Sequence, residues 1–374
     1  MPQNNQYLII SQSGRALAAS AKRAEIDVHV IDLFADEDTV VNSLSNYSAT
    51  GFSGGNNSEA LIEIVDQYIK HHPDLSIVIG SGFEDNLELL AELEQRFTLI
   101  ANHSSTVRQI KDPVIFFDRL EKLSLPFPEY FTDRPSAPKS ILLQKTIGGA
   151  GGGHISLDKK KVALTSSYYL QAYIEGRNYS ATFLADGKSF YFLGFNETWV
   201  CDKKSDFTFA GAVSNVSLPN KLSEEVTDAI RQLVLSFNLH GLCSLDFIVE
   251  DETGQYLILE VNPRPTATFE LYENQRGLFV QHLAAFDGLM TKPELSQGQS
   301  RALGVLYAEE SITMPLLEWP DWVTDRPKPG KKITKGEPVC TIHAEGSTKN
   351  NSKEQLMMRL ASQGKSLELT SEVA

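Results

Sequence analysis

Short apolar runs alternate with amphipathic stretches along the N-terminal part of the chain. The apolar runs have the length of strands and cover residues 7–11, 28–34, 76–83 and 98–102. The stretches between them favour helices and cover residues 13–24, 58–72 and 86–97. Strands that alternate with helices at this spacing predict parallel βαβ units. We therefore expect an open α/β domain over residues 1–105.

The pattern changes after this domain. Residues 112–131 predict a helix closed by a proline-containing turn, and residues 132–140 predict a loop. Residues 222–238 predict a second helix, with Ser223 as its N-cap and Gly241 just past its end. Strands dominate the rest, and we expect them at residues 141–146, 154–157, 168–174, 179–186, 189–196, 207–216, 242–250 and 255–262.

The tail from about residue 300 predicts short strands and turns, followed by a linker-like stretch at 347–353 and a final helix. The expected fold class is therefore α/β and α+β. An N-terminal open α/β domain precedes α+β lobes at 106–300 and a small β-rich C-terminal subdomain with the terminal helix at 301–374.

Composition narrows the kinds of partner. The chain has 374 residues and a net charge of −14, which argues against nucleic acid or an anionic membrane as the main partner. Its three cysteines show no metal-ligand spacing and fit reduced thiols in the cytoplasm. The N-terminus lacks the features of a signal peptide, and no apolar run is long enough to span a membrane. We expect a cytoplasmic protein that acts on small molecules.

Residues 148–153 contain five glycines, and Lys145 stands just before them. Without Cβ atoms, backbone N–H groups can close around phosphate oxygens, and the lysine adds a positive charge. The alternative is a flexible hairpin tip, but ordering five glycines costs backbone entropy without any packing gain. The order of lysine and glycines differs from the usual phosphate loop, and the protein-kinase motifs are absent. The stretch predicts a phosphate-covering loop between two strands.

The two strands around residues 251–255 predict a hairpin that carries acidic side chains. If the turn centres on Thr253, Asp246 lies opposite Glu260, and Asn262 shares the face of Glu260. Facing carboxylates repel unless a cation lies between them, and oxygen ligands of this kind suit Mg²⁺. The alternative is a pair of solvated carboxylates. Arg264 follows at once, placed for an anionic group. The opposite face predicts core residues Leu245, Phe247, Leu257, Leu259 and Val261.

Ligands of open α/β sheets bind beyond the carboxyl ends of the strands. This rule nominates two loops, at Ser11, Ser13, Gly14 and Arg15 and at Gly80, Ser81, Gly82 and Glu84. The first loop could equally be a helix start with an exposed arginine. Asp32 after a glycine-containing turn invites a dinucleotide interpretation, but G-x-G-x-x-G is missing, so we do not expect NAD or FAD.

Four motifs occur in one order: K-x-x-G-G-x-G-G-G at 145–153, LQAYIEGRNYS at 170–180, LDF at 245–247 and LEVNPRP at 259–265. Together they resemble the ATP-grasp superfamily of carboxylate–amine ligases, over roughly residues 5–345. Within it the chain looks closest to the tyramine–glutamate ligase type of methanofuran and methylofuran biosynthesis. That closer resemblance rests on SGRALAASAKRA with IDLFADEDT, on GSGFE, and on the tail WPDWVTDRP-x-PG.

The resemblance implies roles for residues of this chain. Lys145, with Lys111 as candidate partner, would hold ATP phosphates, and Arg264 would steady the transferred phosphoryl or acyl-phosphate. Asp246, Glu260 and Asn262 would hold one or two Mg²⁺ ions, or Mn²⁺ in their place. The phosphate cover would be Gly149, Gly151, Gly152 and Gly153, and the adenine hinge would be Gln171, Ala172, Tyr173 and Ile174.

The chain departs from the pattern of the superfamily at two points, and the role of one further residue stays open. Asn178 stands where an acid usually contacts the ribose, and Glu175 could substitute for it. The first phosphate lysine usually follows an aspartate, whereas Lys111 precedes one. His154 could contact phosphate or pack within the loop.

The resemblance also implies the reaction and the partners. A carboxylate would be activated as an acyl-phosphate and attacked by an amine, releasing ADP and phosphate. Glutamate and a tyramine-like amine are the expected pair, selected near Ser13, Gly14, Arg15, Ser81 and Glu84. The alternatives are a ligase or carboxylase acting on another small acid, and a nucleotide-binding subunit without catalysis. A homodimer fits the superfamily.

Overall fold

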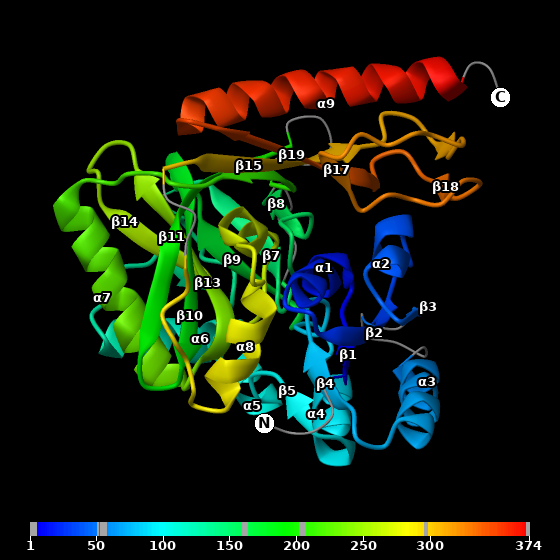
Figure 1. Cartoon of the computed structure of the whole chain (residues 1–374). Coiled ribbons are helices and arrows are strands. Elements are labelled where there is room, and N and C mark those ends of the chain that lie inside the picture. Colours follow the sequence, from blue (N-terminus) through cyan, green and yellow to red (C-terminus); the bar gives the residue numbers. More distant parts are fainter. Residues whose placement is uncertain are drawn as a thin grey trace.

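The computed structural model describes residues 6–50, 52, 58–138, 140–158, 164–201, 207–294 and 298–371 (Figure 1). The N-terminal part is built around a parallel five-stranded sheet of order β3-β2-β1-β4-β5. Its strands are β1 (Gln6–Ile10), β2 (Asp27–Asp32), β3 (Ser45–Ser48), β4 (Ser76–Ile79) and β5 (Leu99–Ile100). The helices that accompany them are α1 (Arg15–Arg23), α2 (Glu37–Val41), α3 (Ser58–His71) and α4 (Leu87–Arg96).

This sheet confirms the expected open α/β arrangement, with one strand added. Strand β3 has the sequence SNYS, and its side chains are half-buried or exposed. Because it contains no apolar run, the pattern that identified the other strands did not reveal it.

Two helices connect this sheet to the rest of the chain, where the sequence predicted one. Helix α5 (Ser104–Lys111) ends at Asp112, and α6 (Pro113–Lys122) begins directly after it. The Asp112 carboxylate accepts the backbone N–H groups of Val114 and Ile115 at 2.9 and 3.2 Å, which caps α6. The break leaves Lys111 in the last turn of α5.

A four-stranded antiparallel sheet of order β6-β9-β7-β8 follows. Its strands are β6 (Tyr130–Phe131), β7 (Leu142–Thr146), β8 (Ile155–Leu157) and β9 (Tyr168–Ala172). The glycine-rich stretch is the connection between β7 and β8, as the sequence predicted.

The largest sheet has eight strands in the order β14-β13-β10-β11-β12-β15-β19-β17, and all its neighbours are antiparallel. Its strands are β10 (Gly176–Asp186), β11 (Phe190–Val200), β12 (Phe209–Val213), β13 (His240–Glu250), β14 (Tyr256–Asn262), β15 (Ser300–Tyr307), β17 (Val323–Thr324) and β19 (Pro338–Gly346). A two-stranded ladder joins β16 (Ile312–Thr313) to β18 (Lys332–Ile333).

Helices cover both faces of this sheet. Helix α7 (Asn220–Phe237) buries Val226, Ile230 and Leu233 in one core. The 3₁₀ helix η1 (Ala267–Tyr272) and α8 (Leu278–Phe286) contribute to a second core that α1 shares. Helix α7 begins three residues before the predicted cap Ser223, and Pro219 occupies the N-cap position.

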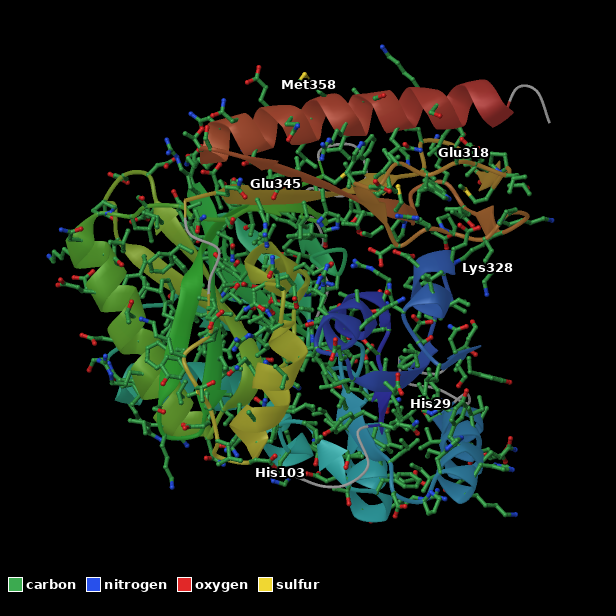
Figure 2. The ribbon with its side chains drawn as sticks, in the orientation of Figure 1. His29, His103, Glu318, Lys328, Glu345 and Met358 are labelled. Atoms are coloured by element: carbon green, nitrogen blue, oxygen red, sulfur yellow. The ribbon has the colours of Figure 1, made fainter. Side chains whose placement is uncertain are left out.

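The C-terminal helix α9 (Lys349–Ser371) lies along β15 and β19 (Figure 1). Its start corrects the linker predicted at 347–353: the Thr348 hydroxyl accepts the backbone N–H of Asn351 at 3.2 Å, which helps begin the helix. Figure 2 shows Met358 projecting outward from α9, in line with its 61% exposure, whereas Leu356 is fully buried. Within the described part of the chain, no helix combines the length and apolarity needed to cross a bilayer.

Candidate active site

A cavity of about 650 Å³ lies between the four-stranded sheet and the eight-stranded sheet. Its walls come from segments far apart in sequence, including α5, the β7–β8 connection, β9, the β13–β14 hairpin and the loop after β14. The predicted residues that line it are Ser81, Lys111, Lys145, Gly149, Gly151, Gly152, His154, Gln171, Ala172, Tyr173, Ile174, Asn178, Asp246, Glu260, Asn262 and Arg264. The volume is ample for a nucleotide-sized ligand.

The β13–β14 hairpin places the acidic pair as predicted. Asp246 pairs with Glu260, and Ser244 pairs with Asn262. Toward the turn the register shifts by one residue, so that Phe247 pairs with Ile258 and Leu259 becomes the extra residue of a bulge.

The bulge changes which side chains of β14 face the core. Tyr256 and Ile258 are buried there, in place of the predicted Leu257 and Leu259, which are only half-buried. Leu259 lines the cavity instead. A count from the turn with a fixed period of two cannot detect an inserted residue, and this explains both the error at Leu257 and the missed cavity contact at Leu259.

The oxygens of Glu260 and Asn262 converge on one point. The Lys111 ammonium lies 3.3 Å from both Glu260 Oε2 and Asn262 Oδ1. The Asn262 amide in turn donates to Asp246 Oδ2 at 3.0 Å. A carboxylate and an amide oxygen at a cation position, with a second carboxylate hydrogen-bonded to that amide, fit a hard divalent ion such as Mg²⁺. Within the described ranges, no cluster of three or more His, Cys, Asp or Glu side chains offers an alternative metal site.

The pKa values of the two carboxylates in the acidic pair are shifted in opposite directions. Burial and the neighbouring Glu260 charge raise the pKa of Asp246. Burial would also raise the pKa of Glu260, but the charges of Lys111, Lys145 and His154 outweigh it and lower that pKa. Without a further cation, Glu260 therefore holds the negative charge while Asp246 tends to keep its proton.

Lys145 is buried but has no partner among the described residues. Its side chain, on β7, is 7% exposed, and it makes no hydrogen bond or ion pair with any described residue. Burial lowers the pKa of Lys145 to about 8, with Lys111 acting in the same direction and Glu260 and Asp246 opposing it. A buried, unpaired ammonium that faces a cavity favours an anionic ligand.

The glycines of the β7–β8 connection have distinct surroundings. A Cβ on Gly148 would lie 2.4 Å from the Glu84 carbonyl oxygen, and one on Gly152 would lie 1.8 Å from that of Phe207. Gly149 packs against the His154 ring, and Gly153 does not line the cavity. Gly151 has φ +70° and no atom within 4 Å of the position that a Cβ would occupy. Glycine is favoured there because it adopts a positive φ without strain, and not because space is short. His154 packs against Gly149 within this loop and also lines the cavity, so its position fits both expected roles.

The hinge after β9 offers an unsatisfied side chain. Gln171 is 1% exposed, and its Nε2 has no hydrogen-bond partner among the described residues. The backbone N–H groups of Ala172 and Tyr173 already donate to Glu129 O and Ile141 O, both at 2.8 Å. Asn178 lines the cavity, whereas Glu175 is exposed and does not. Of the two ribose candidates, Asn178 is thus the better placed.

Arg264 connects this site to the N-terminal sheet. Its Nε forms a buried ion pair with Glu84 Oε1, and its Nη1 donates to Pro265 O at 3.2 Å. Glu84 does not line the large cavity. Ser81 does, together with Gln12, which the sequence analysis did not single out although it lies in the first strand-end loop.

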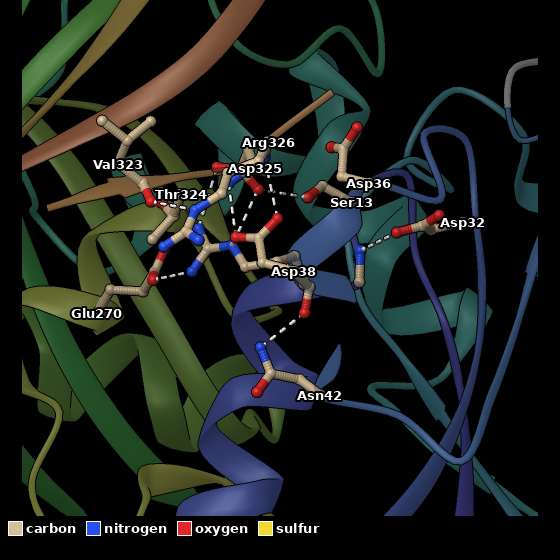
Figure 3. A network of polar contacts seen from close by, with 12 residues as sticks. Ser13, Asp32, Asp36, Asp38, Asn42, Glu270, Val323, Thr324, Asp325 and Arg326 are labelled. Carbon is tan, nitrogen blue, oxygen red and sulfur yellow. Dashed lines mark hydrogen bonds and ion pairs between the residues drawn. The ribbon is translucent and has the colours of Figure 1, made fainter. Parts of the chain in front are cut away.

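The other N-terminal candidates lie elsewhere. Arg15 begins α1, is 4% exposed, and pairs with Glu270 and Asp325, as Figure 3 shows for these acidic neighbours. Ser13 donates to Asp325 at 3.5 Å, and Gly14 is the N-cap of α1. None of these three residues lines the cavity. The helix-start alternative fits this segment, except that the arginine is buried rather than exposed.

Comparison with known proteins agrees with this geometry. Residues 110–268 match the model of the ATP-grasp domain family. An uncharacterised protein of Methanocaldococcus jannaschii is 24% identical over 368 residues, covering 93% of this chain and 90% of that protein. The carbamoyl phosphate synthase large chain of Methanobrevibacter smithii is 21% identical over 298 residues, which are 71% of this chain but only 28% of the relative. This chain therefore spans little more than a quarter of that enzyme.

Solved structures share the fold. An L-amino acid ligase from Bacillus licheniformis superimposes with a TM-score of 0.72 at 13% identity, covering 97% of this chain and 98% of that one. The biotin carboxylase domain of 2-oxoglutarate carboxylase from Hydrogenobacter thermophilus, a dimer with MgADP, ADP and bicarbonate, gives 0.72 at 13% identity, covering 94% and 88%. The matched model shows an ATP-grasp domain at residues 110–268, and the solved structures show that the chain shares their fold. These findings confirm the expected fold class, and the domain match supports the expected resemblance to ATP-grasp proteins; they do not distinguish the tyramine–glutamate type.

Proposed function

We propose that this chain is an ADP-forming ATP-grasp ligase that joins a carboxylate to an amine. The observation that carries the proposal is the cavity itself, in which Lys111, Lys145 and Arg264 surround the Asp246–Glu260–Asn262 group. Three cations around a divalent-ion site suit a nucleotide triphosphate and an anionic second substrate. The MgADP and ADP bound to the Hydrogenobacter relative support ATP and Mg²⁺ as cofactors.

Each group has a place in the proposed reaction. When bound, Mg²⁺ would offset charge on the phosphates during transfer. Lys145, which has no partner in the part of the chain that the structure describes, would pair with phosphate oxygens. The glycine loop would cover these oxygens and exclude water that could hydrolyse an acyl-phosphate. Arg264 would orient the carboxylate that receives the phosphoryl group. The amine then displaces phosphate from the acyl carbon, forming the amide.

For the substrates, we propose glutamate and a phenolic amine such as tyramine, in methanofuran or methylofuran biosynthesis. The support is the resemblance of the N-terminal and tail motifs, together with the placement of Gln12 and Ser81 in the cavity wall. We also propose domain boundaries near residues 105 and 300, cytoplasmic location, and assembly as a homodimer like the Hydrogenobacter relative.

The test is Mg²⁺-dependent release of ADP from ATP with pairs of acids and amines. The panel combines glutamate, aspartate and bicarbonate with tyramine, tyrosine and aliphatic amines, and Glu260→Gln serves as the inactive control. ADP that requires glutamate and a phenolic amine together would establish the ligase and its substrates. ADP with another pair would keep the ligase but reject these substrates. ATP binding without ADP from any pair would contradict the ligase and favour a nucleotide-binding subunit.

A further inference from the structure

The loop after β4 meets the candidate active site through Glu84. Its carboxylate is 5% exposed and uses both oxygens within the protein. Oε1 pairs with Arg264 Nε, and Oε2 accepts the backbone N–H groups of Gly82 and Phe83, each at 3.0 Å. A carboxylate held by two backbone donors through one oxygen has little freedom to rotate, so the oxygen that meets Arg264 has a fixed direction.

The backbone of Glu84 is itself held from the other side. The Glu84 carbonyl and the Cα of Asp85 lie 2.4 and 2.9 Å from the position that a Cβ on Gly148 would occupy. The first glycine of the phosphate-covering loop therefore packs directly on this loop. The carboxylate that meets Arg264 thus belongs to a segment fixed by its own hydrogen bonds and by close packing.

The ion pair with Glu84 leaves the Nη2 side of the Arg264 guanidinium available for a ligand. Nε donates to Glu84 and Nη1 donates to Pro265 O, whereas Nη2 has no hydrogen-bond partner within the described part of the chain. The side chain is 14% exposed and lines the large cavity. The fork of a guanidinium is rigid, so fixing its Nε edge also fixes the direction of its Nη2 donor.

The charge of Glu84 suits this role. Burial alone would raise the pKa of Glu84, but Arg264 and Lys111 outweigh it and lower that pKa, so the carboxylate is ionised at neutral pH. Because both its oxygens are used and it does not line the large cavity, it is poorly placed to bind substrate.

We propose that Glu84 is a positioning residue that aims the Arg264 guanidinium at the carboxylate or acyl-phosphate in the cavity. This inference rests on the ligase function proposed above. It replaces the substrate contact expected for Glu84 with an action through Arg264. The N-terminal sheet would then contribute to catalysis without touching the reacting atoms.

The first test is a double-mutant cycle on ADP release with Glu84→Gln, Arg264→Met and the double variant. Glu84→Gln should lower kcat roughly 10- to 100-fold, the range for partners that orient a functional side chain, with the KM for ATP nearly unchanged. Adding Glu84→Gln to Arg264→Met should cause little further loss. Independent, multiplying losses would overturn the proposal. The matched control is Glu94→Gln, which removes the α4 carboxylate that pairs with His103 and Ser104. It should leave kcat unchanged.

A second measurement does not depend on turnover. The Nε–Hε NMR signal of Arg264, assigned by its absence in Arg264→Lys, should exchange slowly with solvent in the wild type and in Glu94→Gln. It should broaden or exchange rapidly in Glu84→Gln. Slow exchange that survives Glu84→Gln would refute the positioning role. If no acid–amine pair yields ADP, the ligase proposal fails, and this measurement still decides whether Glu84 holds Arg264.

Discussion

Two buried polar clusters of this chain contain the same kinds of side chain but differ in how completely those side chains are paired. We call them the cavity cluster (Lys111, Lys145, Asp246, Glu260 and Asn262) and the Arg15 cluster (Arg15, Asp38, Glu270 and Asp325). The first lines the cavity between two sheets. The second joins α1, α2, η1 and the C-terminal segment (Figure 3).

In the Arg15 cluster every charged group has a protein partner. Arg15 Nη2 donates to Glu270 Oε1 at 2.8 Å and to Asp325 Oδ2 at 3.0 Å. The Asp38 carboxylate accepts the backbone N–H groups of Asp325 and Arg326, both at 2.9 Å. This pairing holds four parts of the chain together, and each nitrogen of the Arg15 guanidinium already donates to a protein carboxylate.

In the cavity cluster, by contrast, the charged groups are incompletely paired within the described part of the chain. Lys145 has no partner among the described residues, and burial and Glu260 raise the pKa of Asp246. Groups buried in such states destabilise the free protein, and they are retained where a ligand supplies the missing charges. The difference teaches that pairing, rather than charge or burial, separates a candidate active site from a structural junction.

The largest effect is expected from a substitution that disrupts the cavity cluster. Asp246→Asn should reduce ADP release about 1000-fold or more, because a ligand of the divalent ion is lost. The same change should raise the free energy of unfolding of the free protein at pH 8, by about 1.4 kcal/mol for each unit by which folding raises the pKa of Asp246. The folded-state pKa of Asp246 is raised, so the penalty of ionising it is absent at about pH 4 and grows as the pH increases.

Steady-state kinetics and urea denaturation from pH 4 to 8 measure both quantities. The control is Asp251→Asn, the same change at an exposed position in the turn of the same hairpin, which should alter neither. A loss of stability in Asp246→Asn that is equal at all pH values would contradict the interpretation that the charges of the cavity cluster are incompletely paired.

The second prediction breaks the Arg15 cluster. Arg15→Leu should lower the free energy of unfolding by about 3–5 kcal/mol, because Glu270 and Asp325, which are largely enclosed, would lose their counter-charge. The folded fraction should retain its KM for both substrates, since Arg15 does not line the cavity. Urea denaturation and kinetics at low temperature provide the measurements.

Arg96→Leu is the comparison variant, because Arg96 pairs with Asp66 and Glu92 at the surface with 38% of its side chain exposed. It should cost less than about 1 kcal/mol. If Arg15→Leu instead weakened substrate binding while stability stayed intact, Arg15 would be a substrate residue after all.

The sequence predicted most of the cavity cluster because its members share local patterns. Asp246 and Glu260 face each other through hairpin geometry, and the glycine stretch follows Lys145 directly. The bulge at Leu259 could not be predicted, since alternation of side chains carries no signal for an inserted residue. Strand β3 was missed because its polar sequence is held by its neighbour rather than by its own burial.

The partners of Arg15 and Glu84 could not be predicted either. Arg15 meets Asp325 across 310 residues, and Glu84 meets Arg264 across 180. Strand-end rules locate both side chains near a sheet edge but do not say which distant segment packs there. The rule nominated Arg15 and Glu84 alike, and only the fold showed that neither lines the cavity.

The smallest effect is expected from the titration of Lys145. It sharpens the contrast between the cavity cluster and the Arg15 cluster. Burial lowers the pKa of Lys145 to about 8, against about 10.4 in the unfolded chain. Between these values the unfolded chain binds more protons, so the stability of the free protein should rise with pH, by about 1 kcal/mol from pH 8 to 9. Affinity for MgADP should fall about fivefold over the same interval, because the ammonium that meets the phosphates is lost.

These opposite trends in one pH window distinguish a ligand-binding charge from a structural one. A paired lysine that loses its charge would lose stability and leave nucleotide affinity unchanged. Calorimetric titration with MgADP and urea denaturation at pH 7.5, 8.5 and 9.5 would follow both trends. Lys145→Arg is the matched control, because its charge does not titrate in this range and both trends should disappear. Nucleotide affinity that stayed constant in the wild type would mean that Lys145 does not contact the phosphates, and the unpaired charge in the cavity would then need another ligand.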